Sequence, residues 1–410
     1  MLAGSAGPAV ATAMRVIVGV GEVGGAKELI PIGSAHIDSC LYHGRAGLDF
    51  AEQLVGHGAA VTVPTTLNVS SLDLLHPRLV HGDAETMVNG RRLMDAYVAM
   101  GGRPTWTCAP YQADSRPGFG EHVAWAESNA IVFANSVLGA RTDRYGDFLD
   151  ICAAITGLAP LSGLHLDENR LATMVFDVSA LPPPMLHSEI LAAVLGYLVG
   201  ARCGTGVPAI VGLPHLDEDA LKAFGAAAAS SGGVGLFHAV GTTPEAPDLK
   251  SVLTDADAVE WVRLTRHDLA AARAELITAT GDLIDAVSIG TPHCSLTELT
   301  RLAELVDGRR IHPDVDFYAC TGRTVLAQAT AAGISQVCEQ AGVQFVTDTC
   351  TYITPVLRAG HRTVMTNSAK WAHYAPGNLD VEVVMASLSE CVTTACNGKA
   401  VRHDPDWALN

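Results

Sequence analysis

Short runs of β-branched residues alternate with alanine- and leucine-rich stretches along most of this 410-residue chain. The runs predict strands at residues 16–18, 61–63, 209–211 and 343–347. Helical stretches lie between them, and this alternation is typical of βαβ units, in which helices cover parallel sheets. The expected fold class is therefore α/β.

The length of the chain exceeds the usual size of a single domain, so two or three lobes are expected. Residues 1–14 are rich in glycine and alanine and are predicted to form a flexible N-terminal tail. A helix is predicted from Ser188 through Tyr197, and the glycine-rich stretch 200–206 that follows suggests a boundary. The expected lobes are residues 15–200, residues 201–285 and residues 286–410.

Charge and cysteine usage limit the classes of partner and compartment. The net charge of −17, without a basic stripe, argues against nucleic acid or a membrane surface as a partner. Ten cysteines are scattered over a long chain, unlike the dense pattern of a small secreted scaffold, and this favours a reducing compartment. No basic leader region and no apolar stretch of membrane-spanning length is found. We therefore expect a cytoplasmic protein whose thiols are free to act as ligands.

A glycine motif near the N-terminus suggests a nucleotide-binding oxidoreductase. Gly19, Gly21 and Gly24 have Gly-x-Gly-x-x-Gly spacing after the predicted strand at residues 16–18. A dinucleotide loop also needs a full helix after it, but Pro31 would end that helix early. The motif is therefore a weak indication of nicotinamide binding.

Two polar segments in the first third have the composition of binding loops. Residues 33–42 contain Asp38, Ser39 and Cys40 near flanking glycines, and residues 64–71 contain Asn68 after a predicted strand. Backbone amides in a glycine-flanked turn can hold a carboxylate or phosphate, and strand ends often carry ligand contacts. An ordinary polar turn explains each segment equally well.

A cysteine and a pair of polar residues follow further along. Cys108 lies in the segment 105–111, whose tryptophan and tyrosine could shield a metal cluster from water. A buried structural cysteine is the alternative. Glu127 and Ser128 precede the apolar run 131–133, and polar groups at a buried element need partners. Those partners are either a substrate or local backbone groups, as in a helix cap.

In the last third, a predicted strand at residues 285–289 leads into a turn that carries His293 and Cys294. Ser295 and Glu298 then have the spacing of a capping box, which predicts a helix from residue 296 onward. The turn is therefore expected at the carboxyl end of a strand, where open α/β sheets place ligands.

Cys350 follows the predicted strand at 343–347 in the same way, so two strand ends present thiols. Thiolates are ligands for iron-sulfur clusters or zinc. Cys108, Cys294 and Cys350 lie in separate segments, without the Cys-x-x-Cys pairs of structural zinc sites. A dispersed three-thiolate site favours an iron-sulfur enzyme, and a structural zinc protein or an inactive binding subunit remains the alternative.

Six segments taken together resemble the aconitase X family, and the resemblance extends from about residue 15 to residue 402. It implies an aconitase-like fold, with several α/β lobes around a central cluster site, and a hydro-lyase that dehydrates a small hydroxy acid. The forms GSAHIDSCLYHG and GTPH resemble the cis-3-hydroxy-L-proline dehydratase branch, with mevalonate 5-phosphate dehydration as the alternative. The segments are TWTCAPYQ, WAESNAIVFANSVLGARTDRYGDFLD, GLHLDENR, IGTPHCS, TDTC and MTNSAKWAHYAPG.

The resemblance also implies roles for single residues. Cys108 and Cys350 match cluster ligands, and Lys370 and His293 are the catalytic candidates. The positions that resemble substrate contacts are Ser39, Cys40, Asn68, Glu127 and Ser128.

One departure from the family pattern makes the third cluster ligand uncertain. Thr291 stands where the archaeal-like motif Gly-Cys-Pro-His has cysteine. Cys294 is the expected replacement, with Cys40 and Cys320 as fallbacks. The cluster is expected to be either 2Fe-2S or 4Fe-4S.

The resemblance further implies a smaller swivelling domain, fused or separate, that completes the site and supplies a serine base. The few residues after Cys396 leave no room for such a domain in this chain. A separate small subunit is therefore the expected partner, together with the small hydroxy acid substrate.

Overall fold

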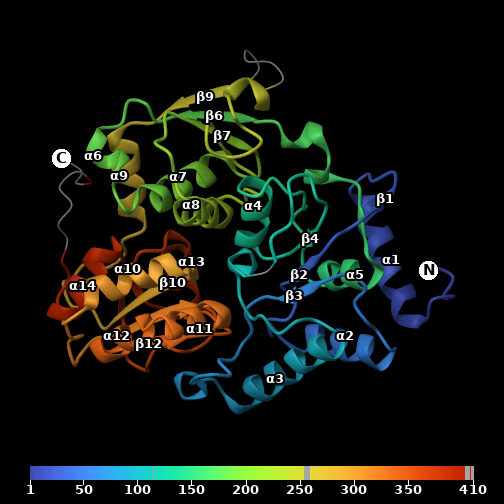
Figure 1. Ribbon diagram of the computed structural model, residues 1–410, viewed down its shortest axis with the longest axis horizontal. Coiled ribbons are helices and arrows are strands. Elements are labelled where there is room, and N and C mark those ends of the chain that lie inside the picture. The colour runs from blue at the N-terminus through green and yellow to red at the C-terminus, as the bar shows by residue number, and fades with distance from the viewer. Residues whose placement is uncertain (114, 254–258, 402–406, 408–410) are drawn as a thin grey trace.

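The computed structural model describes residues 1–113, 115–253, 259–401 and 407 (Figure 1). Three parallel sheets with helices packed on them divide the chain into a first lobe, a middle lobe and a third lobe. The predicted α/β fold class is confirmed. Among the described helices, none combines the length and the apolar character needed to cross a bilayer. The lobes comprise residues 1–170, 171–276 and 277–401.

The first lobe, blue to teal in Figure 1, contains a parallel sheet in the order β3-β2-β4 and an antiparallel pair of β1 with β5. Its loops after β2 and β3 form one wall of the site described below. The strands are β1 (Leu29–Pro31), β2 (Ala35–Ile37), β3 (Thr65–Leu67), β4 (Ala124–Trp125) and β5 (Leu158–Pro160), and the α-helices are α1 (Pro8–Val23), α2 (Arg45–Gly56), α3 (Ala84–Ala99), α4 (Ser128–Ser136) and α5 (Leu149–Thr156).

The middle lobe contains a parallel sheet in the order β8-β7-β6-β9. Helices α7 and α8 pack tightly on each other and connect this lobe with the third lobe beneath it in Figure 1. The strands are β6 (Met174–Asp177), β7 (Pro208–Val211), β8 (His238–Ala239) and β9 (Glu260–Arg263), and the helices are α6 (Pro183–Leu186), α7 (Leu191–Cys203), α8 (Glu218–Ser231) and α9 (Arg266–Glu275).

The third lobe, orange to red in Figure 1, has a five-stranded parallel sheet in the order β12-β11-β10-β13-β14. Its central strand β10 is buried at every position, as expected for a parallel strand with helices on both faces. The strands are β10 (Ala286–Cys294), β11 (Asp316–Thr321), β12 (Val343–Val346), β13 (Thr363–Thr366) and β14 (Glu382–Met385), and the helices are α10 (Leu296–Val306), α11 (Arg323–Ala331), α12 (Ile334–Ala341), α13 (Ala369–Leu379) and α14 (Leu388–Asn397).

Two predictions about the N-terminal region are wrong. Residues 16–18 are helical, and α1 also includes residues 8–14 of the predicted tail. Ala9, Ala13 and Ile17 recur four residues apart and are buried in the core of the first lobe, so one face of the segment is apolar with helical spacing. The glycine motif therefore lies within and at the end of a helix, without the loop that a dinucleotide phosphate requires.

The helical state of the glycine motif can be tested with one substitution. Gly19 is exposed within α1, and a Cβ atom built there meets no other atom within 4 Å. Gly19→Ala is therefore expected to raise the free energy of unfolding by about 0.5–1 kcal/mol, because alanine loses less backbone entropy in a helix. Urea denaturation followed by circular dichroism measures the change. Destabilisation by Gly19→Ala would contradict the helical assignment.

The predicted boundary near residue 200 falls inside α7, and β6 pairs with β7 and β9. Residues 171–200 therefore belong with the middle sheet and not with the first lobe. A Cβ atom on Gly196 would lie 2.2 Å from the Phe224 carbonyl oxygen, and one on Gly200 would lie 2.4 Å from that of Ala228. These glycines allow α7 and α8 to approach each other closely, which explains the composition that suggested a linker. The strand predicted at 61–63 is also wrong, since β3 begins at Thr65.

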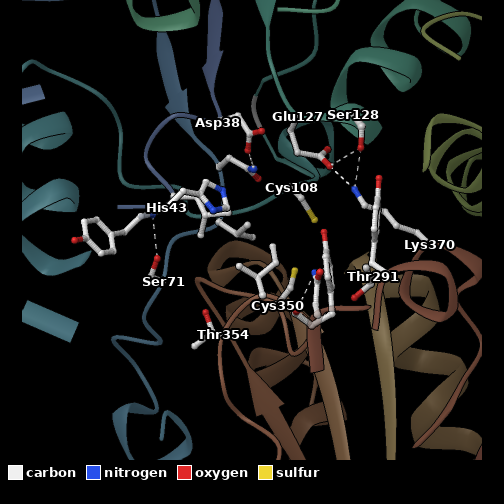
Figure 2. Close-up of a pocket in the computed structure, with 18 of the residues that line it drawn as sticks. Asp38, His43, Ser71, Cys108, Glu127, Ser128, Thr291, Cys350, Thr354 and Lys370 are labelled. Atoms are coloured by element: carbon white, nitrogen blue, oxygen red, sulfur yellow. Dashed lines mark hydrogen bonds and ion pairs between the residues drawn. The ribbon is translucent and has the colours of Figure 1, made fainter. Parts of the chain in front are cut away.

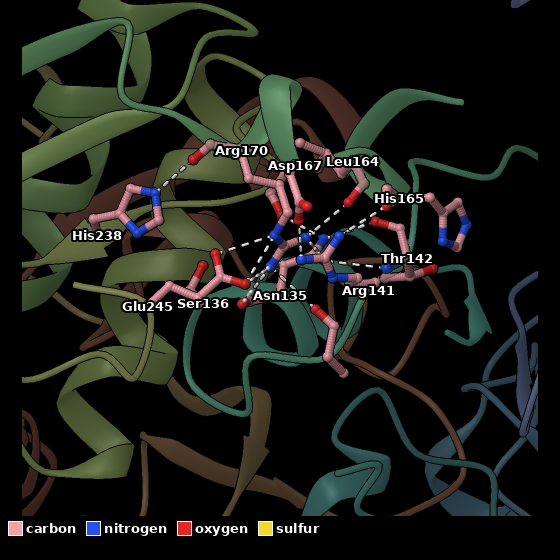
Figure 3. Close-up of polar contacts among 12 residues, drawn as sticks. Asn135, Ser136, Arg141, Thr142, Leu164, His165, Asp167, Arg170, His238 and Glu245 are labelled. Carbon is pink, nitrogen blue, oxygen red and sulfur yellow. Dashed lines mark hydrogen bonds and ion pairs between the residues drawn. The ribbon is translucent and has the colours of Figure 1, made fainter. Parts of the chain in front are cut away.

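A buried arginine holds the first and middle lobes together (Figure 3). Arg170, 4% exposed, donates from Nε to the Glu245 carboxylate at 2.9 Å and 3.1 Å. Its other nitrogens donate to the Asn135 side chain at 3.0 Å and to the Leu164 carbonyl at 2.8 Å. The Arg170 carbonyl contacts His238 Nε2 at 2.7 Å. Because a planar guanidinium fixes several partners at once, this network sets the orientation of α4 relative to the middle sheet.

Candidate active site

A pocket of about 650 Å³ lies between loops of the first lobe and strand ends of the third lobe (Figure 2). Asp38 and Asn68 line it from the first lobe, and Thr291 and Cys350 line it from the third. The pocket lies at the carboxyl ends of β2, β3, β10 and β12, where parallel sheets commonly bind ligands. Neither lobe alone encloses it.

Two aspartates lock the lobes together beside the pocket. Asp73 accepts hydrogen bonds from the backbone N–H and the hydroxyl of Thr347, both at 2.8 Å. The Ser70 N–H donates to the Asp348 carbonyl at 2.6 Å, and Arg323 pairs with the Asp348 carboxylate. Asp348 has a φ of 63°, a conformation that non-glycine residues rarely adopt and that needs strong local contacts. These contacts fix the loop that presents Cys350.

Cys108 and Cys350 come together in the pocket from distant parts of the sequence. Their sulfur atoms and one nitrogen of His293 all lie within 4.8 Å of one another, and all three residues are buried. The neighbouring Cys108 thiol and burial raise the pKa of Cys350 well above its usual value. Two thiolates at this distance repel each other, so a bound cation would stabilise them both. The hydroxyl of Thr291 is also buried nearby, without a hydrogen-bond partner among the described residues. This donor set fits a metal cluster.

The ring of His293 is already bonded within the protein. Its Nδ1 contacts the Thr107 hydroxyl at 3.0 Å, and its Nε2 contacts the Thr349 carbonyl at 3.1 Å. A carbonyl accepts only, so Nε2 carries the proton and Nδ1 accepts from Thr107. Burial lowers the pKa of His293 to about 4, so the ring is neutral. The geometry therefore argues against the predicted catalytic role, and the His293 N–H instead donates to Cys108 Sγ at 3.3 Å.

Cys294 does not join the thiol pair, which corrects the predicted metal ligand. Its side chain packs in the apolar core of the third lobe, and burial raises the pKa of its thiol well above the usual value. Gly290, at φ 86°, approaches the Cys320 carbonyl, and the pairing of β10 with β11 shifts register between Ile289 and Cys294. This irregularity turns Thr291 toward the pocket and leaves Cys294 facing the core.

The two fallback ligands are not part of the thiol pair, although Cys320 lies close enough for its charge to raise the pKa of Cys350. The Cys40 thiol donates to the carbonyls of Ile37 at 3.3 Å and Asn68 at 3.4 Å, and Cys320 is buried in the main apolar core. Neither lines the pocket.

Glu127, Ser128 and Lys370 form an ionic cluster at the pocket wall (Figure 2). Lys370 Nζ lies 2.5 Å from Glu127 Oε1 and donates to Ser128 Oγ at 3.1 Å. Glu127 also caps α4, because its carboxylate accepts a hydrogen bond from the Ala130 N–H at 2.8 Å. The backbone of Glu127 has a φ of 72°. Burial is the largest single influence on the pKa of Glu127 and raises it, but the charge and hydrogen bond of Lys370 together with backbone N–H donors lower the pKa below its usual value. Both groups are therefore ionised, and Lys370 keeps a third N–H for a ligand.

The loop after β2 presents a different residue from those predicted. The backbone N–H groups of Asp38 and Ser39 donate to Asp150 at 2.8 Å and 3.0 Å. Ser39 Oγ bonds to Asp150 and to Tyr97, so Ser39 faces the interior of the lobe together with Cys40. The predicted substrate contacts Ser39 and Cys40 therefore do not line the pocket, which Asp38 does.

Asp38 belongs to the polar segment 33–42 but is not among the predicted substrate contacts. It is the first residue after the carboxyl end of β2, and that position is the signal that identifies it. Asn68, a predicted contact, donates to the Asp38 carboxylate and lines the same pocket. Burial and the negative charge of Glu127 raise the pKa of Asp38 to about 7.

Comparison with known proteins agrees with this architecture. The models of the aconitase X first, second and third domains match residues 1–168, 172–274 and 284–397. A cis-3-hydroxy-L-proline dehydratase from Pseudomonas aeruginosa is 46% identical over 99% of this chain and 70% of its own length. A phosphomevalonate dehydratase large subunit from Methanothermobacter thermautotrophicus is 39% identical over 94% of each chain.

A solved structure shares the fold as well as the sequence. The holo-form of aconitase X from Thermococcus kodakaraensis has a TM-score of 0.87 and 35% identity, covering 96% of this chain and 97% of its own. Matched domain models account for nearly the whole chain, and its lobes enclose a thiol-lined pocket. The chain therefore belongs to the aconitase X family.

Proposed function

We propose that this chain is the cluster-bearing part of a hydro-lyase that dehydrates cis-3-hydroxy-L-proline. The observation that carries the proposal is one pocket that contains both a buried thiol pair and a buried lysine beside a carboxylate. The thiols suit an iron-sulfur cluster, and the lysine suits the carboxylate of a small acid. Relatives named for this activity are 46% and 42% identical to the chain.

The cluster is proposed to be held by Cys108 and Cys350. Because the structure brings together two thiolates and not three, with Thr291 at the position of a third ligand, we propose a 2Fe-2S cluster in preference to a 4Fe-4S cluster. When bound, its iron would act as a Lewis acid toward the hydroxyl that leaves the substrate. The buried surroundings of the thiols exclude bulk water from that position.

The residues of the chain itself position the substrate. Lys370 Nζ directs its remaining N–H at the substrate carboxylate, and Glu127 and Ser128 hold the ammonium group in place. A carboxylate bound to a cation stabilises the negative charge that develops when the α proton leaves. Loss of that proton and of the C3 hydroxyl yields an enamine, which tautomerises to Δ1-pyrroline-2-carboxylate.

The base is proposed to come from a swivelling domain on a separate small subunit. The archaeal relatives are named large subunits, a name that implies a smaller partner. His293 is neutral, bonded at both ring nitrogens and absent from the pocket lining, which supports a base from outside these lobes. The ten free cysteines support the proposed cytoplasmic location.

The test is turnover of cis-3-hydroxy-L-proline by anaerobically purified, reconstituted chain, alone and mixed with a candidate small subunit. Formation of Δ1-pyrroline-2-carboxylate only in the mixture is expected. Mevalonate 5-phosphate is assayed in parallel as the alternative substrate, and metal analysis distinguishes iron from zinc. Dehydration of mevalonate 5-phosphate without any turnover of the hydroxyproline would refute the proposed substrate, and full activity of the chain alone would refute the partner.

A further inference from the structure

Asp38 is a carboxylate in the pocket wall without a cationic partner among the described residues. Asn68 orients it through a hydrogen bond, and the Asp150 carboxylate holds its backbone. Glu127, the other carboxylate of the wall, is already paired with Lys370. The wall therefore combines one satisfied ion pair with one acidic group that lacks a counter-charge.

We propose that Asp38 determines substrate class by binding the ring ammonium of an imino acid while Lys370 binds its carboxylate. This inference rests on the proposed function, since it explains which hydroxy acids the pocket accepts. Figure 2 shows Asp38 and Lys370 on either side of Cys108 in the same opening. A zwitterion such as 3-hydroxyproline carries its positive and its negative group on the same α-carbon, so it complements both charges at once.

The same charges disfavour a phosphorylated substrate. Lys370 is the only lysine or arginine among the described residues that line the pocket, and it is paired with Glu127. Phosphate sites normally use arginine clusters or helix N-termini, and like charges brought together cost several-fold in affinity or more. Asp38 and Glu127 would both repel a phosphate dianion. Burial and Glu127 raise the pKa of Asp38 to about 7, and a bound ammonium would lower that pKa again.

The test compares two ligands of the same ring size, L-proline and cyclopentanecarboxylate, by calorimetric binding to the reconstituted chain. Both carry the carboxylate, but only proline carries an ammonium. Asp38→Asn keeps the shape and the acceptor for Asn68 and removes the charge. Wild type is expected to prefer proline by about 10- to 100-fold, and Asp38→Asn is expected to lose that preference. Asp49→Asn, an exposed partner of Arg45, serves as the control and should keep it.

The ratio of the two affinities separates the proposed role from a structural one, because general damage to the pocket weakens both ligands alike. Asp38→Ser is a second variant, used if Asp38→Asn fails to fold. A preserved preference for proline in either variant would overturn the inference. If wild type does not turn over hydroxyproline, the proposed function fails. The ratio of proline affinity to cyclopentanecarboxylate affinity still tests the role of Asp38 in that case.

Discussion

Replacing either Cys108 or Cys350 by alanine is expected to remove bound iron and to lower kcat by at least about 1,000-fold, because a Lewis-acidic metal contributes several kcal/mol to transition-state stabilisation. The two sulfur atoms face the same space, so loss of either leaves a single thiolate that cannot hold a cluster. Iron and labile sulfide content, measured on anaerobically purified protein, check the first effect, and the rate of hydroxyproline dehydration checks the second.

Cys294→Ala is the matched control, since it removes a buried thiol from the same strand, three positions past Thr291 in the pocket lining. Its iron content is expected to equal that of wild type, because Cys294 packs in the core. Equal loss of iron in Cys294→Ala and Cys350→Ala would show that Cys294 is a ligand after all. Full iron content in Cys350→Ala would contradict the proposed cluster site.

Lys370→Met is expected to lower the free energy of unfolding by about 3–5 kcal/mol, because it leaves the Glu127 carboxylate buried without its partner. Lys370 and Glu127 are 4% and 8% exposed, so solvent cannot replace the lost charge. Glu127→Gln combined with Lys370→Met removes both charges and should recover most of the stability without recovering activity. Urea denaturation and turnover measure the two effects.

The same pair predicts opposite pH dependences. In wild type, Lys370 lowers the pKa of Glu127 from its usual 4.5, so the stabilisation is present above that value and is lost as acid protonates the carboxylate. In Lys370→Met, burial is no longer opposed by Lys370, so the pKa of Glu127 is expected to rise above 4.5 and stability to be lost as the pH rises past that value. Urea denaturation of Lys370→Met at pH 4 and at pH 6 measures this difference. If the unfolding free energy of Lys370→Met increased over this range as in wild type, the stability of the fold would not depend on the Lys370–Glu127 pair.

Local patterns in the sequence correctly predicted several elements. The helix after Ser295 has the predicted capping box, and strands occur at residues 208–211 and 343–346 close to the predicted runs. These features depend on interactions between residues near in sequence. The strand prediction at 16–18 is wrong because a few β-branched residues fit a helix as well as a strand, and burial of Ala13 and Ile17 on one face favours the helix.

The fold class, the family resemblance and the loops that form the pocket follow from residue patterns along the chain. Which side chain of each loop enters the pocket depends on the three-dimensional fold. Asp38 enters where Ser39 does not, and Thr291 enters where Cys294 does not. The physical reason is that neighbouring residues point in different directions, and their direction is set by distant partners such as Asp150. Each loop of the site can therefore be predicted from the sequence, but contacts between segments that are distant in the sequence assemble the loops into one pocket.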